Sequence, residues 1–195
     1  MSPSSGGHMD ELVEQYLRTL DSTIIDSFRM LFYEASDSQL GAISARYGNA
    51  SGLNKEWIYD DGVQANMIRR LGEELILISL YHLFEKKLKE IIRYRHSTSS
   101  NENQGDKHSL HRWDEMKKYI PESVKKSNEY QHVNTLRVLV NCFKHAGIVS
   151  AELNMLEPSF GQVGDEIICD IGSLYEKYKI CASSVIRQTY VDHRT

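Results

Sequence analysis

Apolar residues recur every three to four positions along most of this chain, which is the spacing of amphipathic helices. Four long helices are predicted from this spacing, over residues 10–35, 63–95, 122–146 and 173–190. In the second of them, residues 75–84 are apolar nearly all round, so we expect its middle to lie at the centre of the fold.

Shorter segments separate these helices. Residues 36–62 predict a connection, because glycine and asparagine recur along them, with one short helix at residues 39–47. Residues 97–109 are polar and low in complexity, which indicates a flexible loop. Two short helices are expected at residues 112–119 and 150–156, and one short β element at residues 166–170.

These elements predict an all-α protein, an antiparallel four-helix bundle with long connections. One domain is expected over residues 9–195, because 41% of the 195 residues are hydrophobic and only 3 are proline. Residues 1–8 (MSPSSGGH) are expected to be an expression-vector remnant before a native Met9. Helical bundles often associate in pairs, so a homodimer is expected.

Composition excludes several classes of protein. A net charge of -4 argues against a nucleic-acid coat protein, although a local basic surface stays open. The three cysteines, Cys142, Cys169 and Cys181, form no C-x-x-C pair, which argues against a disulfide framework and fits the reducing cytoplasm. The histidines at residues 96–111 lack the companions of a zinc site, and no metal or other cofactor is expected. The longest apolar run is about half of a membrane span, so no membrane contact is expected.

The most informative segment is residues 136–150, LRVLVNCFKHAGIVS. Its helix is apolar over much of its circumference, and Arg137, Asn141 and His145 follow i, i+4, i+8 spacing along one polar stripe without an acidic residue. A guanidinium and a carboxamide suit the binding of a phosphodiester, and an imidazole can move a proton near neutral pH. The competing interpretation is that this stripe is the ordinary solvent face of a bundle helix.

On these residues the segment resembles the HEPN superfamily, small helical-bundle proteins of which many are ribonucleases of toxin–antitoxin and antiviral systems. An arginine, a polar position and a late histidine are the hallmark, and Arg137, Asn141 and His145 match them. The sequence that follows, with Gly147, Ser150, Leu153 and Pro158, and the stretch YHLFEKKLKEII at residues 81–92 are similar to uncharacterised bacterial members. The resemblance covers residues 65–160 and implies a dimeric, metal-independent endoribonuclease with an antitoxin or defence partner.

The resemblance also implies roles for the stripe. The RNA 2′-OH would attack the adjacent phosphate, with His145 assisting proton transfer, Arg137 stabilising the transition-state charge and Asn141 orienting the phosphate or the histidine. Seven residues separate Arg137 from His145, more than the usual spacer. A non-catalytic dimeric bundle that binds RNA or a partner protein therefore stays open as the alternative, as does a plain helical scaffold.

A second basic surface is predicted on the longest helix. Lys86, Lys89 and Arg93 share one of its faces and could follow an RNA backbone together with Lys144. The alternative is a solvated face, because acidic residues lie nearby.

Neighbouring residues have expected structural roles. His82 lies in the apolar run and is expected to be buried and hydrogen-bonded. Glu73 and Glu74 could pair with Arg137, which would make that arginine structural.

Overall fold

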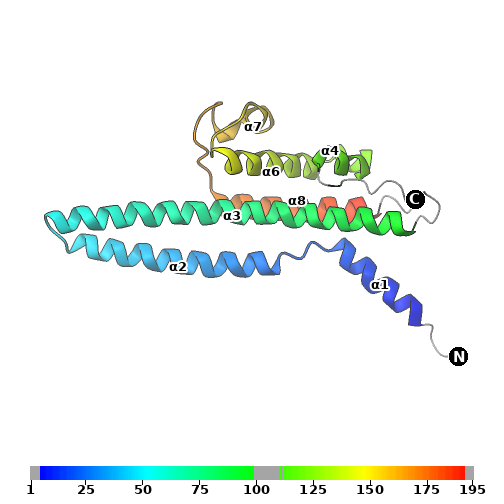
Figure 1. The fold of residues 1–195 in the computed structure, drawn as a ribbon, viewed down its shortest axis with the longest axis horizontal. Helices are drawn as coiled ribbons and strands as arrows, with labels where there is room; N and C mark the ends of the chain where they lie inside the picture. The colour runs from blue at the N-terminus through cyan, green and yellow to red at the C-terminus, as the bar shows by residue number, and fades with distance from the viewer. Residues whose placement is uncertain (1–4, 99–109, 111, 192–195) are drawn as a thin grey trace.

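The computed structural model describes residues 5–98, 110 and 112–191 (Figure 1). The α-helices are α1 Ser5–Arg18, α2 Thr23–Gly48, α3 Leu53–Thr98, α4 Trp113–Met116, α5 Glu122–Lys125, α6 Asn128–His145, α7 Ala151–Leu156 and α8 Ile171–Val191. Two 3-10 turns, Lys117–Tyr119 and Pro158–Phe160, follow α4 and α7.

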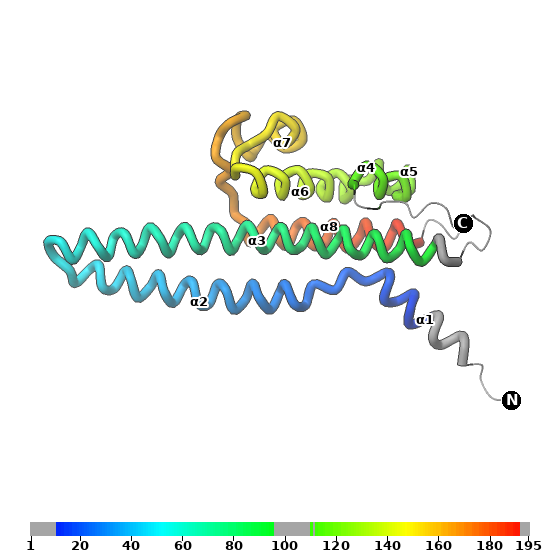
Figure 2. The backbone as a smooth tube through the Cα atoms, viewed as in Figure 1, coloured from blue at the N-terminus to red at the C-terminus, as the bar shows by residue number. Residues whose placement is uncertain are grey.

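The longest helix, α3, has 46 residues and runs through the middle of the molecule (Figures 1 and 2). The antiparallel helix α2 packs along its first half, and α6 and α8 pack against its second half. Helices α3 and α8 run in one direction and α2 and α6 in the other. The tip of the α2–α3 hairpin extends beyond the other helices. The predicted all-α helical bundle is confirmed.

The core lies where α3, α6 and α8 meet. Side chains with no exposed surface come from all three helices: Leu77, Leu80, Phe84, Leu88, Leu136, Leu139, Tyr175, Ala182 and Val185. Burying one such large apolar side chain contributes about 2 kcal/mol. The expectation that the apolar middle of the longest helix is central is confirmed from residue 76 onward.

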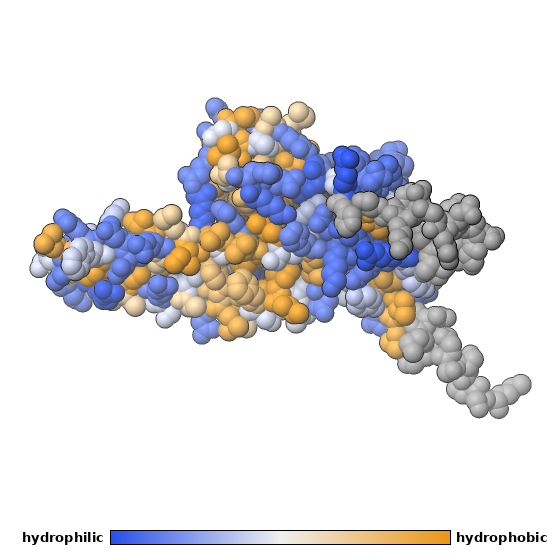
Figure 3. Space-filling model, in the orientation of Figure 1, coloured by the Kyte–Doolittle hydropathy of each residue, from blue (hydrophilic) through white to orange (hydrophobic). Residues whose placement is uncertain are grey.

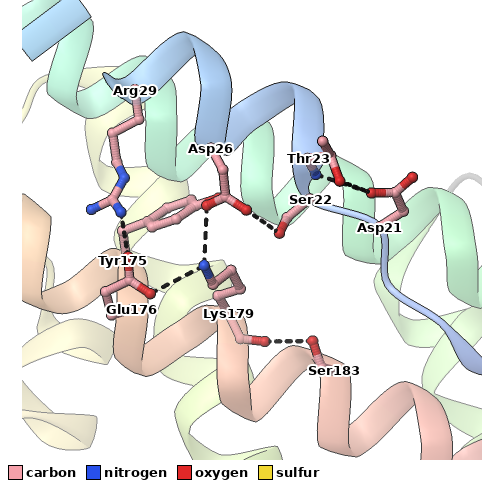
Figure 4. A network of polar contacts seen from close by, with 9 residues as sticks. All are labelled: Asp21, Ser22, Thr23, Asp26, Arg29, Tyr175, Glu176, Lys179 and Ser183. Atoms are coloured by element: carbon pink, nitrogen blue, oxygen red, sulfur yellow. Dashed lines mark hydrogen bonds and ion pairs between the residues drawn. The ribbon is translucent and has the colours of Figure 1, made fainter. Parts of the chain in front are cut away.

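A polar network joins α2 to α8 (Figure 4). The carboxylate of Asp26 accepts hydrogen bonds from Ser22 Oγ (2.7 Å), the Tyr175 hydroxyl (2.9 Å) and Lys179 Nζ (3.0 Å). One turn later, Arg29 pairs with Glu176 of α8. The network fixes one side of α2 and leaves its opposite side turned away from α8.

The first predicted helix, over residues 10–35, is wrong in its extent, because the chain leaves the helix between Arg18 and Thr23. The Asp21 carboxylate accepts hydrogen bonds from the backbone N (3.0 Å) and Oγ1 (2.6 Å) of Thr23. Such side-chain bonds compete with the helical backbone bonds. Leu20 also turns into the core at this break.

The predicted connection over residues 36–62 is mostly helical. The short helix expected at residues 39–47 is the second half of α2, and the real turn lies at Gly52, whose φ of 60° is left-handed. A glycine lowers helix stability by only about 1 kcal/mol. The contact of Ile43 with Gly62 across the hairpin helps to offset that cost.

The third predicted helix, over residues 122–146, is divided at Ser127. Ser127 Oγ accepts a hydrogen bond from the backbone N of Tyr130 (3.2 Å) and caps the start of α6. The helix ends as predicted before Gly147, whose φ is 67°.

The strand predicted over residues 166–170 does not form. Only an isolated bridge joins Ile148 to Glu166, because no described strand lies beside this segment to extend the ladder. The short helices at residues 112–119 and 150–156 are confirmed as α4 with its 3-10 turn and as α7. The predicted flexible loop at residues 97–109 lies outside the described residues beyond Thr98, which ends α3.

Candidate nucleic-acid interface

Helix α6 presents the predicted polar stripe on its outer side. Its inner side is fixed by buried Val133, Leu136, Leu139 and Val140, which pack in the core. With a helical repeat of 3.6 residues, this places residues 137, 141, 144 and 145 on the opposite, outward arc. We call Arg137, Asn141, Lys144 and His145 the α6 stripe.

Arg137 is the most enclosed member of the α6 stripe, with its side chain 16% exposed. Its Nε donates a hydrogen bond to Asn134 Oδ1 (3.1 Å), and its terminal guanidinium pairs with Glu152 of α7. It lines a cavity of about 480 Å³ with Trp113, Lys117 and Tyr130, among others. A bound anion would have to compete with Glu152 for this guanidinium.

Asn141 and His145 are exposed one and two turns further along α6. Within the described part of the chain, neither side chain has a hydrogen-bond or ion-pair partner. The carboxamide and imidazole therefore keep their hydrogen-bonding capacity for a ligand. The α6 stripe thus lies on the outer side of the helix, with Arg137 paired and with Asn141, Lys144 and His145 exposed to solvent.

Lys144 connects the α6 stripe to α3. Its Nζ lies 3.0 Å from His82 Nε2. Partial burial lowers the pKa of His82, and the nearby charges of Lys144 and Lys89 lower it further, against the opposite influence of Glu85. His82 is therefore mainly neutral at pH 7, and its Nε2 can accept the hydrogen bond that the Lys144 ammonium donates.

The predicted basic residues of α3 lie beside this contact. His82, Lys86, Lys89 and Arg93 line one open depression of about 380 Å³, which we call the α3 groove. Glu85 and Glu90 also line it and reduce its positive charge. Because His82 belongs to the α3 groove and contacts Lys144, the α3 groove and the α6 stripe are adjacent.

Two structural expectations about neighbouring residues are corrected. His82 is hydrogen-bonded but exposed, because the outer face of α3 is not covered at this point. Glu73 and Glu74 pair with Arg69 and Arg70 of their own helix, at 3.3 Å and 3.2 Å. Arg137 takes its acidic partner from α7 instead.

Tyr81 and Glu152 also belong to this region. The sequence predicts that Tyr81, with Glu85 one turn later, packs near the late helix, whereas it carries no signal that links Glu152 to the stripe. Burial raises the pKa of Tyr81, and Glu85 raises it further. The Arg137 guanidinium lowers this pKa, so it lies within electrostatic reach of the Tyr81 hydroxyl. Glu152 follows Ser150, which caps α7 by accepting a hydrogen bond from Leu153 N (3.1 Å). The cap sets the start of α7, and the packing of α7 beside α6 brings Glu152 to Arg137.

The described residues include no group of three or more His, Cys, Asp or Glu side chains that could hold a metal ion. In the same part of the chain, no helix has the length and apolar character needed to cross a membrane. Comparisons with protein-family models, with curated proteins and with solved structures found no match. The resemblance to HEPN proteins therefore stays a prediction.

Proposed function

We propose that this protein is a HEPN-like, metal-independent endoribonuclease that binds RNA along the α6 stripe and the α3 groove. The observation that carries the proposal is that exposed Asn141 and His145 lie beside a continuous basic surface. The contact of Lys144 with His82 connects the α6 stripe to the α3 groove in this surface. A phosphodiester chain needs cationic groups in series, and its cleavage needs a group that can move a proton.

The proposed reaction balances without a co-reactant. The 2′-oxygen forms a bond to phosphorus while the bond from phosphorus to the 5′-oxygen breaks, leaving a 2′,3′-cyclic phosphate and a 5′-hydroxyl. The proton lost by the 2′-hydroxyl is replaced by one delivered to the 5′-oxygen, and His145 assists this transfer. Asn141 orients the phosphate, and Arg137 stabilises the charge of the transition state when RNA displaces Glu152.

A second function is favoured by the pairing of Arg137 with Asn134 and Glu152. An arginine held in this way can fix α7 to α6 and need not contact RNA. On this basis the alternative is a non-catalytic bundle that binds RNA or a partner protein through the same surface. For the ribonuclease, we further propose a cytoplasmic role in a bacterial defence or toxin system with an antitoxin-like partner.

Cleavage of a labelled single-stranded RNA in excess chelator tests the proposal. We expect wild-type protein to cut it and His145→Ala to cut at least about 100-fold more slowly, because a positioned acid–base group contributes at least that much. His132→Ala, which changes a half-buried histidine elsewhere on α6, is the matched control and should retain activity. Equal cleavage by wild type and His145→Ala would contradict the proposed role of His145, and RNA binding without cleavage would favour the second function.

A further inference from the structure

The side of the α2–α3 hairpin that turns away from α8 carries a large apolar surface (Figure 3). Its members are Ile24, Phe28 and Leu31 of α2 and Ile68, Leu71 and Leu75 of α3. Their exposed fractions run from 47% for Leu75 to 86% for Ile24. We call these six residues the hairpin face. Monomeric proteins rarely expose so continuous a set of large apolar side chains.

The two helices contribute to one face because of how they pack. Phe32 lies against Gly72, which aligns the middle of α2 with the corresponding part of α3. Helical spacing then places each apolar set on the side opposite Asp26 and Arg29, which contact α8. In addition, α2 has no buried side chain along its whole length. Amphipathic helices normally bury their apolar side, so this hairpin lacks a covering layer among the described residues.

We propose that the hairpin face binds the hairpin face of a second copy of this chain, with the two α3 helices antiparallel. The distribution of charge along α3 supports this occupant. The outward side of α3 has Asp60 before its apolar residues and Lys86, Lys89 and Arg93 after them, while the adjacent Asp61 pairs with Arg46 of α2. The acidic end of one α3 meets the basic end of a second α3 only when the two helices are antiparallel. A two-fold axis that crosses the hairpin produces this arrangement.

One register satisfies both helices. Pairing Asp60 with the partner subunit's Lys89 puts the two-fold axis between Glu74 and Leu75, within the apolar segment of α3. Since Phe32 is level with Gly72, the same axis crosses α2 between Phe28 and Leu31. Phe28 of one copy then lies opposite the partner subunit's Leu31. The apolar centres of both helices therefore coincide with a single axis.

The charged ends lie at the rim of this arrangement. Rim charges keep access to solvent and orient the two copies more than they add affinity. Lys86 and Arg93 therefore remain available to RNA, and Lys89 at the solvent-exposed rim can exchange the partner subunit's Asp60 for a phosphate. The inference does not depend on ribonuclease activity, because the mass of the protein tests it without RNA.

The assembly is tested by measuring mass by sedimentation over a series from about 1 µM to about 100 µM protein. We expect a dimer for wild type and a rise in the dissociation constant of about 100-fold or more for Leu71→Glu, which places a charge in the apolar centre. Ile180→Glu is the matched control, since Ile180 is an exposed aliphatic residue of α8 outside the hairpin face. Circular dichroism checks that both variants keep their helices. A wild-type monomer over the whole series, or equal weakening by both variants, would overturn the proposal.

The orientation is tested by disulfide cross-linking in a Cys169→Ser background, because Cys169 is the one native cysteine that is not buried. Leu75→Cys lies next to the proposed axis and should cross-link two copies under mild oxidation. Trp57→Cys lies far from the axis in the antiparallel arrangement and should stay reduced. Efficient cross-linking at both positions would indicate parallel helices and contradict the proposed pairing.

Discussion

At the scale of single residues, the ion pair of Arg137 with Glu152 decides how the α6 stripe meets an anion. The arginine is mostly enclosed, whereas Glu152 is 58% exposed, so the carboxylate is the partner that RNA could displace. Removing that carboxylate should leave the guanidinium in place through its hydrogen bond to Asn134.

We therefore expect Glu152→Gln to bind single-stranded RNA about tenfold more tightly, a gain of about 1.4 kcal/mol, because one competing negative charge is lost. Fluorescence anisotropy with a labelled oligonucleotide measures the change. Glu157→Gln is the control, since Glu157 follows the same short helix and does not pair with Arg137 in the described structure. Unchanged or weaker binding by Glu152→Gln would show that Arg137 is a structural residue.

At the scale of elements, the attachment of α2 to α8 depends on the ionised form of Asp26. Burial alone would raise the pKa of Asp26, but hydrogen bonds from Ser22, Lys179 and Tyr175 outweigh it and lower the pKa below its usual value. A carboxyl group whose pKa is lower in the folded state stabilises the fold above its unfolded pKa of about 3.9. That contribution is lost as the pH falls through the folded pKa.

Asp26→Asn should consequently be less stable than wild type at pH 7, with the difference shrinking toward pH 3. Urea denaturation followed by circular dichroism at both pH values measures it. Glu34→Gln, which changes an exposed carboxylate on the same helix, should show a much smaller difference at pH 7. A penalty for Asp26→Asn that does not change with pH would mean that the carboxylate charge is not what stabilises the contact.

The same elements show what the sequence could predict. The helical cores follow from the spacing of residues such as Leu77, Leu136 and Val185, because that spacing reflects burial directly. The interruptions before Thr23 and at Ser127 depend on local side-chain hydrogen bonds that interrupt an otherwise helical pattern. The helical part of residues 36–62 depends on packing across the hairpin, which outweighs its glycines.

The candidate site likewise has one feature that the sequence could predict and others that it could not. The α6 stripe could be predicted because one helix determines its geometry. The contact of Lys144 with His82 and the pair of Arg137 with Glu152 join residues from different elements. Their proximity depends on how α3, α6 and α7 pack, which periodicity does not specify.

At the scale of the whole molecule, charge is distributed unevenly. The chain has a net charge of -4, yet the α3 groove and the α6 stripe gather basic side chains from two helices. Non-specific affinity for RNA depends on such local clusters and on the counterions that they release. An acidic protein can thus bind RNA along one surface while the rest of its surface repels it.

Salt dependence measures how many of these charges contact RNA. Each neutralised phosphate of a single strand contributes about 0.7 to the slope of log affinity against log salt concentration. Replacing Lys86, Lys89 and Arg93 together with alanine should therefore lower the magnitude of that slope by about 2, while helix content stays constant. A matched triple variant replaces exposed Lys55, Lys126 and Arg187, which lie outside the α3 groove, and should leave the slope near that of wild type. Equal slopes for the two triple variants would contradict the proposed surface. They would mean that the loss of three positive charges has the same effect inside and outside the α3 groove.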